Sequence, residues 1–220
     1  MMMLLKALPM SSSTNNEEHH TSLNPGTLLI VISGPSGVGK DATLNEMRRA
    51  GHNFHYVVTA TTRPKRPAEI DGKDYVFLSR GQFQKMLSNN ELLEWAEVYN
   101  YYYGVPKKQI KRALKAGMDV VVKVDVQGAN TIKQIVPDAV FIFLTPPSLE
   151  ELALRLKNRG NHTEEELHTR LGKAQMEMEC IPMFDYVVQS YKDDLKKTVA
   201  EILSIISAEK SRVNPRQITL

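Results

Sequence analysis

Cysteine is nearly absent from this chain: Cys180 is the only one among 220 residues. A single cysteine excludes an intrachain disulfide and a zinc site made of cysteines alone, so its side chain is expected to pack as a small apolar group. A long hydrophobic run is also lacking, because no apolar stretch approaches the ~18 residues that a membrane-spanning helix needs. The sequence therefore predicts neither a disulfide framework nor a transmembrane helix.

A strong excess of charge of one sign is lacking as well. The chain carries 28 basic and 25 acidic residues, for a net charge of +3, and this balance by itself indicates no polyanion as a partner. The basic residues gather locally, a distribution that suits a small anionic ligand. With 42% hydrophobic and 24% charged residues, the composition is ordinary for a soluble globular protein, and the length suffices for one α/β domain with insertions.

The first 24 residues are polar and rich in serine, threonine and asparagine, so we expect a flexible tail over residues 1–24. The apolar residues between positions 4 and 8 form too short a patch for a secretory signal. A transit peptide would be rich in arginine and poor in acids, whereas this stretch has no arginine and contains Glu17 and Glu18. It is either the remnant of a targeting segment or simply a tail.

The most informative motif is the glycine-rich sequence GPSGVGK at residues 34–40. It follows the apolar run 28–32, which reads as a strand, and precedes the helix-prone residues 42–49, which is the setting that a phosphate-binding P-loop requires. Glycines let successive backbone N–H groups point at an anion, and the helix N-terminus adds partial positive charge. Lys40 then reaches the β- and γ-phosphates of a nucleotide; the alternative is a plain glycine-rich turn. The predicted ATP contacts are Gly34, Pro35, Ser36, Gly37, Val38, Gly39, Lys40, Asp41 and Ala42.

Apolar runs alternate with amphipathic, helix-prone segments along most of the chain. We expect strands at residues 28–32, 56–59, 75–78, 118–125, 140–144 and 186–188, and helices at residues 42–49, 82–87, 107–115, 148–158, 163–179 and 193–210. Such alternation predicts an α/β fold with a parallel sheet covered by helices on both faces. Residues 59–105 interrupt it with a basic, turn-rich stretch and are expected to form an inserted substrate-binding lobe.

Residues 61–75, TTRPKRPAEIDGKDY, resemble the signature T-T-R-x-x-R-x-x-E-x-x-G-x-x-Y with which guanylate kinases bind GMP. Further matches to that family are NNELLEW at 89–95, YYG at 102–104, VDVQG at 124–128 and PPS at 146–148, and the resemblance runs from about residue 27 to residue 210. It implies the P-loop nucleoside monophosphate kinase fold. It also implies ATP-dependent phosphorylation of GMP to GDP, and of dGMP, by direct in-line transfer, with Mg²⁺ accompanying ATP.

The same resemblance divides the chain into parts. It implies a kinase domain over residues 25–215, with a core of residues 25–57, 117–154 and 173–212, a GMP-binding lobe over residues 58–106 and a lid over residues 155–172. The implied catalytic residues are Lys40, Arg155, Arg159 and Arg170. Arginines that arrive when a lid closes neutralise charge on the transferring group and exclude water. The alternative interpretation of these arginines is a basic, solvated helix face.

Eight side chains are implied to bind GMP, and their chemistry suits it. Two guanidinium groups make charge-assisted bonds to a phosphate monoester, and phenolic hydroxyls donate to the same phosphate. The Glu94 carboxylate accepts from both N1–H and N2–H of guanine, donors that adenine does not offer. The expected set is Thr59, Arg63, Arg66, Glu69, Tyr75, Glu94, Tyr103 and Asp125. Without the resemblance, the two arginines and Glu69 read equally well as weak ion pairs of a solvated loop.

Three positions depart from the family pattern. Asp41 stands where a hydroxyl residue normally binds Mg²⁺, Lys123 stands where most members carry an acid, and Val105 replaces a serine or threonine that contacts guanine. We interpret the first two as one charge swap, in which Asp41 either ligates Mg²⁺ directly or pairs with Lys123 and reaches the metal through water. In a competing interpretation Asp41 repels ATP and the enzyme is weak or inactive; in a third it is only a helix-start acid.

Two other functions remain open from the sequence. A non-catalytic guanylate-kinase-like binding module usually has a degraded P-loop, whereas here the lysine and the glycines are intact; another P-loop nucleoside monophosphate kinase is disfavoured by Glu94 and the two tyrosines. Asp41 and YGVP at residues 103–106 resemble the plant organellar branch, which favours plastid or mitochondrion over cytosol. We expect a monomer or dimer that binds ATP and GMP, with neither nucleic acid nor membrane as a partner.

Overall fold

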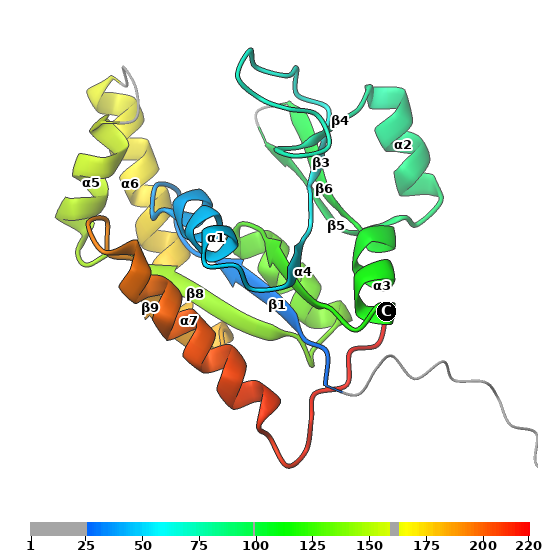
Figure 1. Ribbon diagram of the computed structural model, residues 1–220. Helices are drawn as coiled ribbons and strands as arrows, with labels where there is room; N and C mark the ends of the chain where they lie inside the picture. The colour runs from blue at the N-terminus through cyan, green and yellow to red at the C-terminus, as the bar shows by residue number, and fades with distance from the viewer. Residues whose placement is uncertain (1–25, 99, 159–162) are drawn as a thin grey trace, which may run out of the picture.

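The computed structural model describes residues 26–98, 100–158 and 163–220, so the predicted tail, residues 1–24, lies outside the described part. Within that part the larger sheet has five parallel strands (Figure 1): β1 (Leu29–Ser33), β2 (Phe54–Tyr56), β7 (Asp119–Lys123), β8 (Val140–Thr145) and β9 (Tyr186–Gln189). Their order is β2-β7-β1-β8-β9, so the strand that leads into the P-loop lies in the middle. The predicted α/β class with a parallel sheet is confirmed.

Four helices cover the two faces of this sheet: α1 (Lys40–Arg49), α3 (Lys107–Lys115), α4 (Val126–Ile135) and α7 (Leu195–Lys210). Successive side chains of a strand point to opposite faces. Leu29 and Val31 of β1 accordingly pack in a core cluster with α3 and α4, while Ile30 and Ile32 pack in a second cluster with α1 and α7. The continuous apolar runs of the sequence are therefore those of a sheet buried on both faces.

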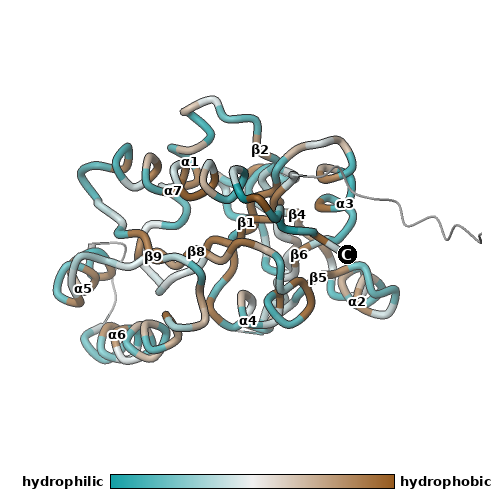
Figure 2. The backbone as a smooth tube through the Cα atoms, turned by 90° about the horizontal axis from the view of Figure 1, so that it is seen from below, coloured by the Kyte–Doolittle hydropathy of each residue, from teal (hydrophilic) through white to brown (hydrophobic). Residues whose placement is uncertain are grey.

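The distribution of apolar residues follows from this layering. Figure 2 shows the hydrophobic colour gathered along β1 and β8 in the middle of the molecule, with hydrophilic segments toward the outside. No helix within the described residues is both long and apolar enough to cross a bilayer.

A smaller sheet lies inside the segment that the sequence marks as an insertion. Its described strands, in the order in which they pair, are β4 (Val76–Phe77), β3 (Ala60–Thr61), β6 (Tyr101–Pro106) and β5 (Leu92–Val98). β5 and β6 run antiparallel, and α2 (Arg80–Ser88) packs on the sheet through Phe83, which is fully buried against Ala60 and Leu92. Figure 1 shows this lobe standing on one side of α1.

A pair of helices, α5 (Leu149–Asn158) and α6 (Glu164–Glu179), stands on the other side of α1 (Figure 1). The two helices meet through buried Leu152, Leu156 and Ala174. α6 begins with the predicted capping box, in which the Thr163 hydroxyl accepts from the Glu166 N–H and the Glu166 carboxylate accepts from the Thr163 N–H. A 3₁₀ turn, η1 (Ile181–Met183), follows before β9. Most of the expected lid falls on this helix pair.

The chain after α7 folds back and becomes part of the core, which the sequence did not predict. Buried Glu209 accepts from the Arg216 guanidinium (2.8 and 2.7 Å) and from the Tyr186 hydroxyl (2.6 Å). The Arg216 hydrogen bonds hold the pKa of Glu209 down at about 2. Arg216 also donates to the Ala139 carbonyl oxygen at 3.0 Å, and Ile218 lies in the core cluster of α3; Figure 1 shows the C-terminus beside that helix.

Two local differences separate the structure from the sequence-based expectation. The strand expected at 56–59 pairs with β7 only over Phe54–Tyr56, because the Gln109 side-chain amide bonds both the N–H and the carbonyl oxygen of Val58 at 2.9 Å and replaces a strand partner there. The helix α4 was not among the predicted helices. The helix forms because the Asp125 carboxylate caps it by accepting from the Gly128 N–H at 2.8 Å.

Candidate active site

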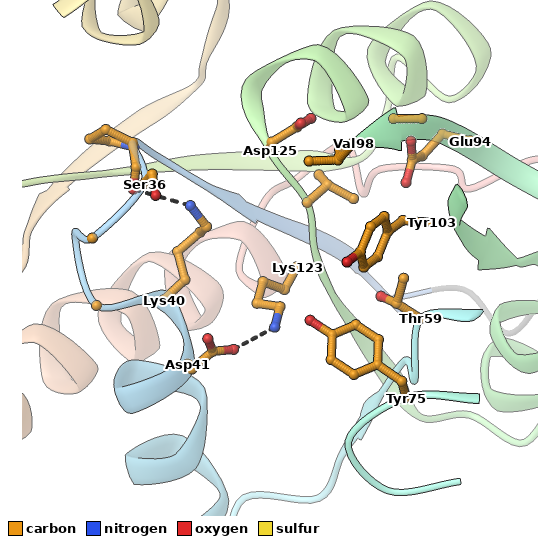
Figure 3. A pocket seen from close by; sticks show the side chains of 15 residues that line it. Ser36, Lys40, Asp41, Thr59, Tyr75, Glu94, Val98, Tyr103, Lys123 and Asp125 are labelled. Carbon is orange, nitrogen blue, oxygen red and sulfur yellow. Dashed lines mark hydrogen bonds and ion pairs between the residues drawn. The ribbon is translucent and has the colours of Figure 1, made fainter. Parts of the chain in front are cut away.

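A cavity of about 330 Å³ lies between the P-loop and the inserted lobe. Its walls come from the P-loop and the first turn of α1, from the carboxyl end of β7, and from the smaller sheet (Figure 3). Ligands of open parallel sheets bind at this carboxyl edge. The cavity is lined by Pro35, Ser36, Gly37, Gly39, Lys40, Asp41, Thr59, Tyr75, Glu94, Ala96, Val98, Tyr103, Lys123, Val124 and Asp125. Residues expected to bind ATP and residues expected to bind GMP thus face one common space.

The P-loop owes its shape to glycines at its two ends. Gly34 has a φ of 142° and Gly39 a φ of 110°, both in the region that favours glycine. A side chain at Gly34 would come within 2.3 Å of the Leu144 carbonyl oxygen on β8, so the loop packs closely on the neighbouring strand. Gly39 is the N-cap of α1, and the helix N-terminus therefore meets the cavity at Lys40 and Asp41 with the partial positive charge that suits a phosphate.

Lys40 is enclosed by the loop that precedes it. Its Nζ donates to the carbonyl oxygens of Gly34 (2.5 Å) and Pro35 (3.2 Å). Burial lowers the pKa of Lys40 to about 8, and the negative charge of Glu177 opposes this shift. A phosphate beside the ammonium adds further negative charge, so a bound nucleotide is expected to favour the charged form of Lys40.

Glu177 on α6 reaches the P-loop, a contact that sequence reasoning missed. Its carboxylate accepts from the Ser36 N–H at 3.3 Å, and its side chain is 13% exposed. Burial raises the pKa of Glu177, while the ammonium of Lys173, 4.0 Å away, favours the charged carboxylate. A carboxylate therefore lies on one of the loop N–H groups that suit a phosphate. No sequence signal separates Glu177 from Glu179, its neighbour in the run MEME.

Arg155, expected as a catalytic arginine of the lid, lies behind the P-loop. Its Nη1 donates to the Val38 carbonyl oxygen at 2.9 Å and its Nη2 to the Ser190 carbonyl oxygen at 3.0 Å. Its Nε donates to the Glu151 carboxylate at 2.9 Å, and the side chain is only 9% exposed. The Ser190 hydroxyl donates to the same Val38 carbonyl at 2.7 Å. Arg155 in this structure joins α5, the P-loop and the end of β9.

The other two expected arginines belong to the segment between α5 and the middle of α6. Arg159 lies outside the described residues. Arg170 lies on α6, seven residues before Glu177 and therefore on the same face of that helix. Because Glu177 contacts the P-loop, this is the face of α6 that turns toward the loop.

Glu94 and Asp125 form an acidic pair in the cavity. Glu94 on β5 is 7% exposed, and its burial, with the nearby charge of Asp125, raises the pKa of Glu94 to about 8. A side chain at Gly128 would come within 3.0 Å of the Glu94 Oε2, which explains a glycine in the first turn of α4. Thr59 lines the same cavity. A buried carboxyl group in this environment is stabilised as an anion by a ligand that brings N–H donors.

The inserted lobe also contributes two tyrosines to the cavity, and a loop that contains two arginines lies beside them. The rings of Tyr75 and Tyr103 lie edge to face with centroids 6.0 Å apart. The Arg63 guanidinium lies 5.4 Å from the Tyr75 ring centroid and donates to the Glu69 carboxylate at 2.6 Å. Glu69 also accepts from the Arg66 N–H at 2.8 Å. The hydrogen bond to Glu69 raises the pKa of Arg63 and lowers the pKa of Glu69, so a permanent cation lies beside the two rings.

A family model described as guanylate kinase matches residues 26–209. The chain belongs to the guanylate kinase family. The match covers both halves of the cavity, the P-loop and the inserted lobe.

Relatives and a solved structure agree with this membership. Guanylate kinase 2, chloroplastic/mitochondrial, from rice (Oryza sativa subsp. japonica) is 41% identical over 218 residues, 99% of this chain and 76% of that protein. The guanylate kinase of Carboxydothermus hydrogenoformans is 43% identical over 192 residues, 86% of this chain and 93% of that protein. The crystal structure of guanylate kinase from Anaplasma phagocytophilum has a TM-score of 0.70 at 32% identity, covering 86% of this chain and 89% of that one.

The two charged residues that depart from the family pattern meet in the cavity. The Lys123 ammonium donates to the Asp41 carboxylate, so the predicted pairing is confirmed. Figure 3 shows the pair between the P-loop helix and the tyrosines. The described residues contain no group of three or more histidine, cysteine or acidic side chains that could hold a metal ion. Because Mg²⁺ is often held by one or two carboxylates together with substrate phosphates, Asp41 at the edge of a phosphate loop fits a metal carried by ATP.

Val105, the third departure, lies in the core. It is fully buried and packs with Leu93 and Ile110 in the cluster that supports α3. Its side chain has no hydrogen-bonding group, and the loss of one guanine contact stays a prediction.

Proposed function

We propose that this guanylate kinase transfers the terminal phosphoryl group of ATP directly to GMP, and to dGMP as a second acceptor, within the cavity described above. The observation that carries the proposal is that one cavity is lined by Lys40 and the P-loop on one side and by Glu94, Tyr75 and Tyr103 on the other. A space of about 330 Å³ brings the ends of two nucleotides together and leaves little room for bulk water between them.

The ATP side acts through charge and backbone N–H groups. The proposed contacts are the P-loop residues 34–42, with Lys40 stabilising the transferring group as charge spreads over its equatorial oxygens. We assign residues 155–172 to a lid that begins at Arg155, whose guanidinium is held on the P-loop in this structure, and that carries Arg159 and Arg170; residues 25–57, 117–154 and 173–212 form the core. The face of α6 that holds Arg170 and Glu177 supports this assignment, because Glu177 already contacts the loop. No general base is needed, since the acceptor oxygen of GMP is ionised near neutral pH.

The GMP side, residues 58–106 together with Asp125, reads the base and holds the phosphate. Glu94 as a carboxylate accepts from N1–H and N2–H of guanine, with Thr59 and Asp125 adding contacts. The phosphate is held by Arg63, Arg66, Tyr75 and Tyr103, and Glu69 orients the arginines. None of these roles involves the 2′-hydroxyl of the ribose, which is the reason to expect dGMP as a second acceptor.

Mg²⁺ is proposed to enter with ATP, and Asp41 is the residue of this chain that would hold it. When bound, the metal neutralises phosphate charge and orients the phosphate chain. The support is the chemistry of a carboxylate in the first turn after a P-loop, exposed to the extent of 61% of its side chain.

The test is ADP release from ATP and Mg²⁺ with GMP, dGMP, AMP, UMP or dTMP as the acceptor. The proposal predicts turnover with GMP and dGMP alone. Turnover with AMP or UMP would contradict the assigned role of Glu94. No turnover, with GMP binding intact by calorimetry, would favour the alternative of a binding module whose ATP side Asp41 and Lys123 have disabled.

We also propose that the chain works in a plastid or mitochondrion, ahead of the cytosol. The support is the rice relative, whose name is chloroplastic/mitochondrial and which aligns with 99% of this chain. Imaging the full chain with a C-terminal fluorescent tag in plant cells tests this, and diffuse cytosolic signal would contradict it.

A further inference from the structure

Lys123 is a cation that lines the cavity, and the proposed function assigns it no role. It is the last residue of β7, the strand next to β1, and its side chain is 26% exposed. Its ammonium pairs with Asp41 in the first turn of α1 and lies 5.9 Å from the Tyr75 ring centroid. Figure 3 shows it reaching into the space between these two residues. Lys123 thus stands where the ATP side and the GMP side of the cavity meet.

The charges around Lys123 are those of a phosphate site that spans both sides. Lys123 is close enough to Lys40 for its charge to contribute to the lowered pKa of Lys40. The Arg63 guanidinium lies beside Tyr75, but it is paired with Glu69 and is not among the residues that line the cavity. The two lysine ammonium groups in the cavity repel each other unless anions lie between them. A phosphate chain that runs from the P-loop to Tyr75 passes close to the Lys123 ammonium.

We propose that Lys123 is a phosphate-binding residue of the transfer reaction, which leaves Asp41 and binds the phosphoryl group in transit when both nucleotides are present. The proposal rests on the proposed function. The Lys123 ammonium keeps its protons throughout: the bond from phosphorus to the bridging oxygen of ADP breaks, and the bond to a phosphate oxygen of GMP forms. Lys123 supplies hydrogen bonds to the equatorial oxygens, where charge spreads.

Little free energy is needed for the Lys123 ammonium to exchange the Asp41 carboxylate for a phosphoryl group. The Asp41 side chain is 61% exposed and that of Lys123 is 26% exposed, so water reaches the pair from the Asp41 side, and ion pairs screened by water contribute little to stability. The lysine stem is flexible and its ammonium has three donors, so Lys123 can change partner without movement of the backbone. Arg155 differs in this respect, because its buried guanidinium is held by hydrogen bonds to the backbone carbonyl oxygens of Val38 and Ser190.

A simpler role for Lys123 predicts a different result, which makes the proposal testable. If Lys123 only neutralises Asp41, Lys123→Met lowers kcat in the wild-type chain but not in an Asp41→Asn background. If Lys123 binds the phosphoryl group, Lys123→Met lowers kcat by a similar factor in both backgrounds, whatever Asp41→Asn costs by itself as a proposed metal ligand. The two roles therefore separate in a double-mutant cycle of kcat.

A binding measurement supplies a readout that is independent of turnover. The probe is a bisubstrate compound in which a pentaphosphate joins adenosine to guanosine, titrated by calorimetry with EDTA present. We expect Lys123→Met to weaken its binding about 10- to 100-fold, the range of one charge-assisted hydrogen bond, and to change the Kd values of ATP alone and GMP alone by less than about threefold. Lys115→Met, at the exposed end of α3, is the matched control and should bind as the wild-type chain does.

The outcomes distinguish a failure of the Lys123 proposal from a failure of the proposed function. Bisubstrate binding by Lys123→Met equal to wild type, or the absence of any effect of Lys123→Met on kcat in the Asp41→Asn background, overturns the Lys123 proposal while GDP formation by the wild-type chain upholds the proposed function. If the wild-type chain neither forms GDP nor binds the bisubstrate compound, the proposed function fails and the Lys123 proposal falls with it. Lys123→Gln repeats the measurement with a polar side chain, and GMP binding by each variant verifies its fold.

Discussion

The two sides of the cavity are built from different parts of the chain. The P-loop side is made mostly of backbone: glycine conformations, N–H groups and the start of α1, with Lys40 as its main charged side chain. The lobe side is made of side chains, with Glu94, Tyr75 and Tyr103 on separate strands or loops of a small sheet. If the P-loop binds ATP as proposed, recognition by its backbone should tolerate a change such as Asp41, because the N–H groups stay in place. Side-chain recognition depends on each residue, so substitutions there should change which nucleotide is accepted.

The largest effect is expected from the one essential side chain of the P-loop side. Lys40→Met should lower kcat about 1,000-fold, because it removes a preorganised charge from the transferring phosphoryl group. GMP binding, measured by calorimetry without ATP, should stay within about twofold of wild type. Loss of GMP binding in this variant would show that the two sides do not act independently.

The corresponding change on the lobe side is Glu94→Gln. It should lower kcat/KM for GMP about 100-fold, since two hydrogen bonds from guanine to a buried carboxylate are lost or reversed. The affinity for ATP should not change. Steady-state kinetics with GMP and AMP measure the selectivity, and an unchanged preference for GMP would contradict the assigned role of Glu94.

The raised pKa of Glu94 predicts how binding depends on pH. With a pKa of about 8, Glu94 is mostly protonated at pH 7, while guanine needs the carboxylate. Binding should therefore release a proton, and guanosine affinity should rise by up to about tenfold per pH unit as the pH increases toward 8. Guanosine is the probe because it has no phosphate that titrates. Calorimetry in two buffers of different ionisation enthalpy counts the protons, and equal heats in both buffers would contradict the prediction. Glu94→Gln is the control without proton release.

A substitution of Arg155 tests whether the stability of the chain depends on the hydrogen bonds that this side chain makes to the P-loop. Arg155→Met removes the hydrogen bonds to the Val38 and Ser190 carbonyls, so the free energy of unfolding should fall by about 2 kcal/mol. Denaturant unfolding measures this, with Lys157→Met at an exposed position of α5 as the matched control. An unchanged stability combined with a large loss of kcat would instead support a direct contact between Arg155 and the phosphates.

The smallest effect concerns the carboxylate that contacts the P-loop. Glu177→Gln removes a negative charge from the Ser36 N–H and from the surroundings of Lys40. ATP affinity should increase about threefold to fivefold, because less repulsion opposes the phosphates. Titration with a non-hydrolysable ATP analogue measures it, and GMP affinity serves as the internal control. Weaker ATP binding would mean that Glu177 contributes to the nucleotide site.

The two sides also differ in how far the sequence predicts them. The P-loop could be predicted in detail, because its glycines, Lys40 and flanking elements are consecutive and each follows from local backbone chemistry. The lobe side could be predicted only through a resemblance to a family, since Thr59, Glu94 and Asp125 come from distant segments that meet only in the folded chain. The Asp41–Lys123 pair was expected because the two charges depart from the family pattern together.

Other features carried no sequence signal. The contact of Glu177 with Ser36 depends on how α6 packs, and the position of Arg155 behind the loop depends on Ser190 at the end of β9. The C-terminal segment packs on the core through one buried residue, Ile218, and through the Arg216–Glu209 hydrogen bonds. No hydrophobic periodicity in the sequence predicts this packing. Tertiary packing determines each of these contacts, so they cannot be predicted from local propensity or residue spacing.

The central claim is that both nucleotides occupy the one cavity together and that the phosphoryl group passes directly between them. The most direct test is the stereochemical course of transfer from ATP that carries a chiral thiophosphoryl group at its terminal phosphate. A single in-line displacement predicts inversion at phosphorus in the thiophosphorylated GMP product. Retention would require two displacements through a phosphorylated residue of the chain, and it would contradict the account.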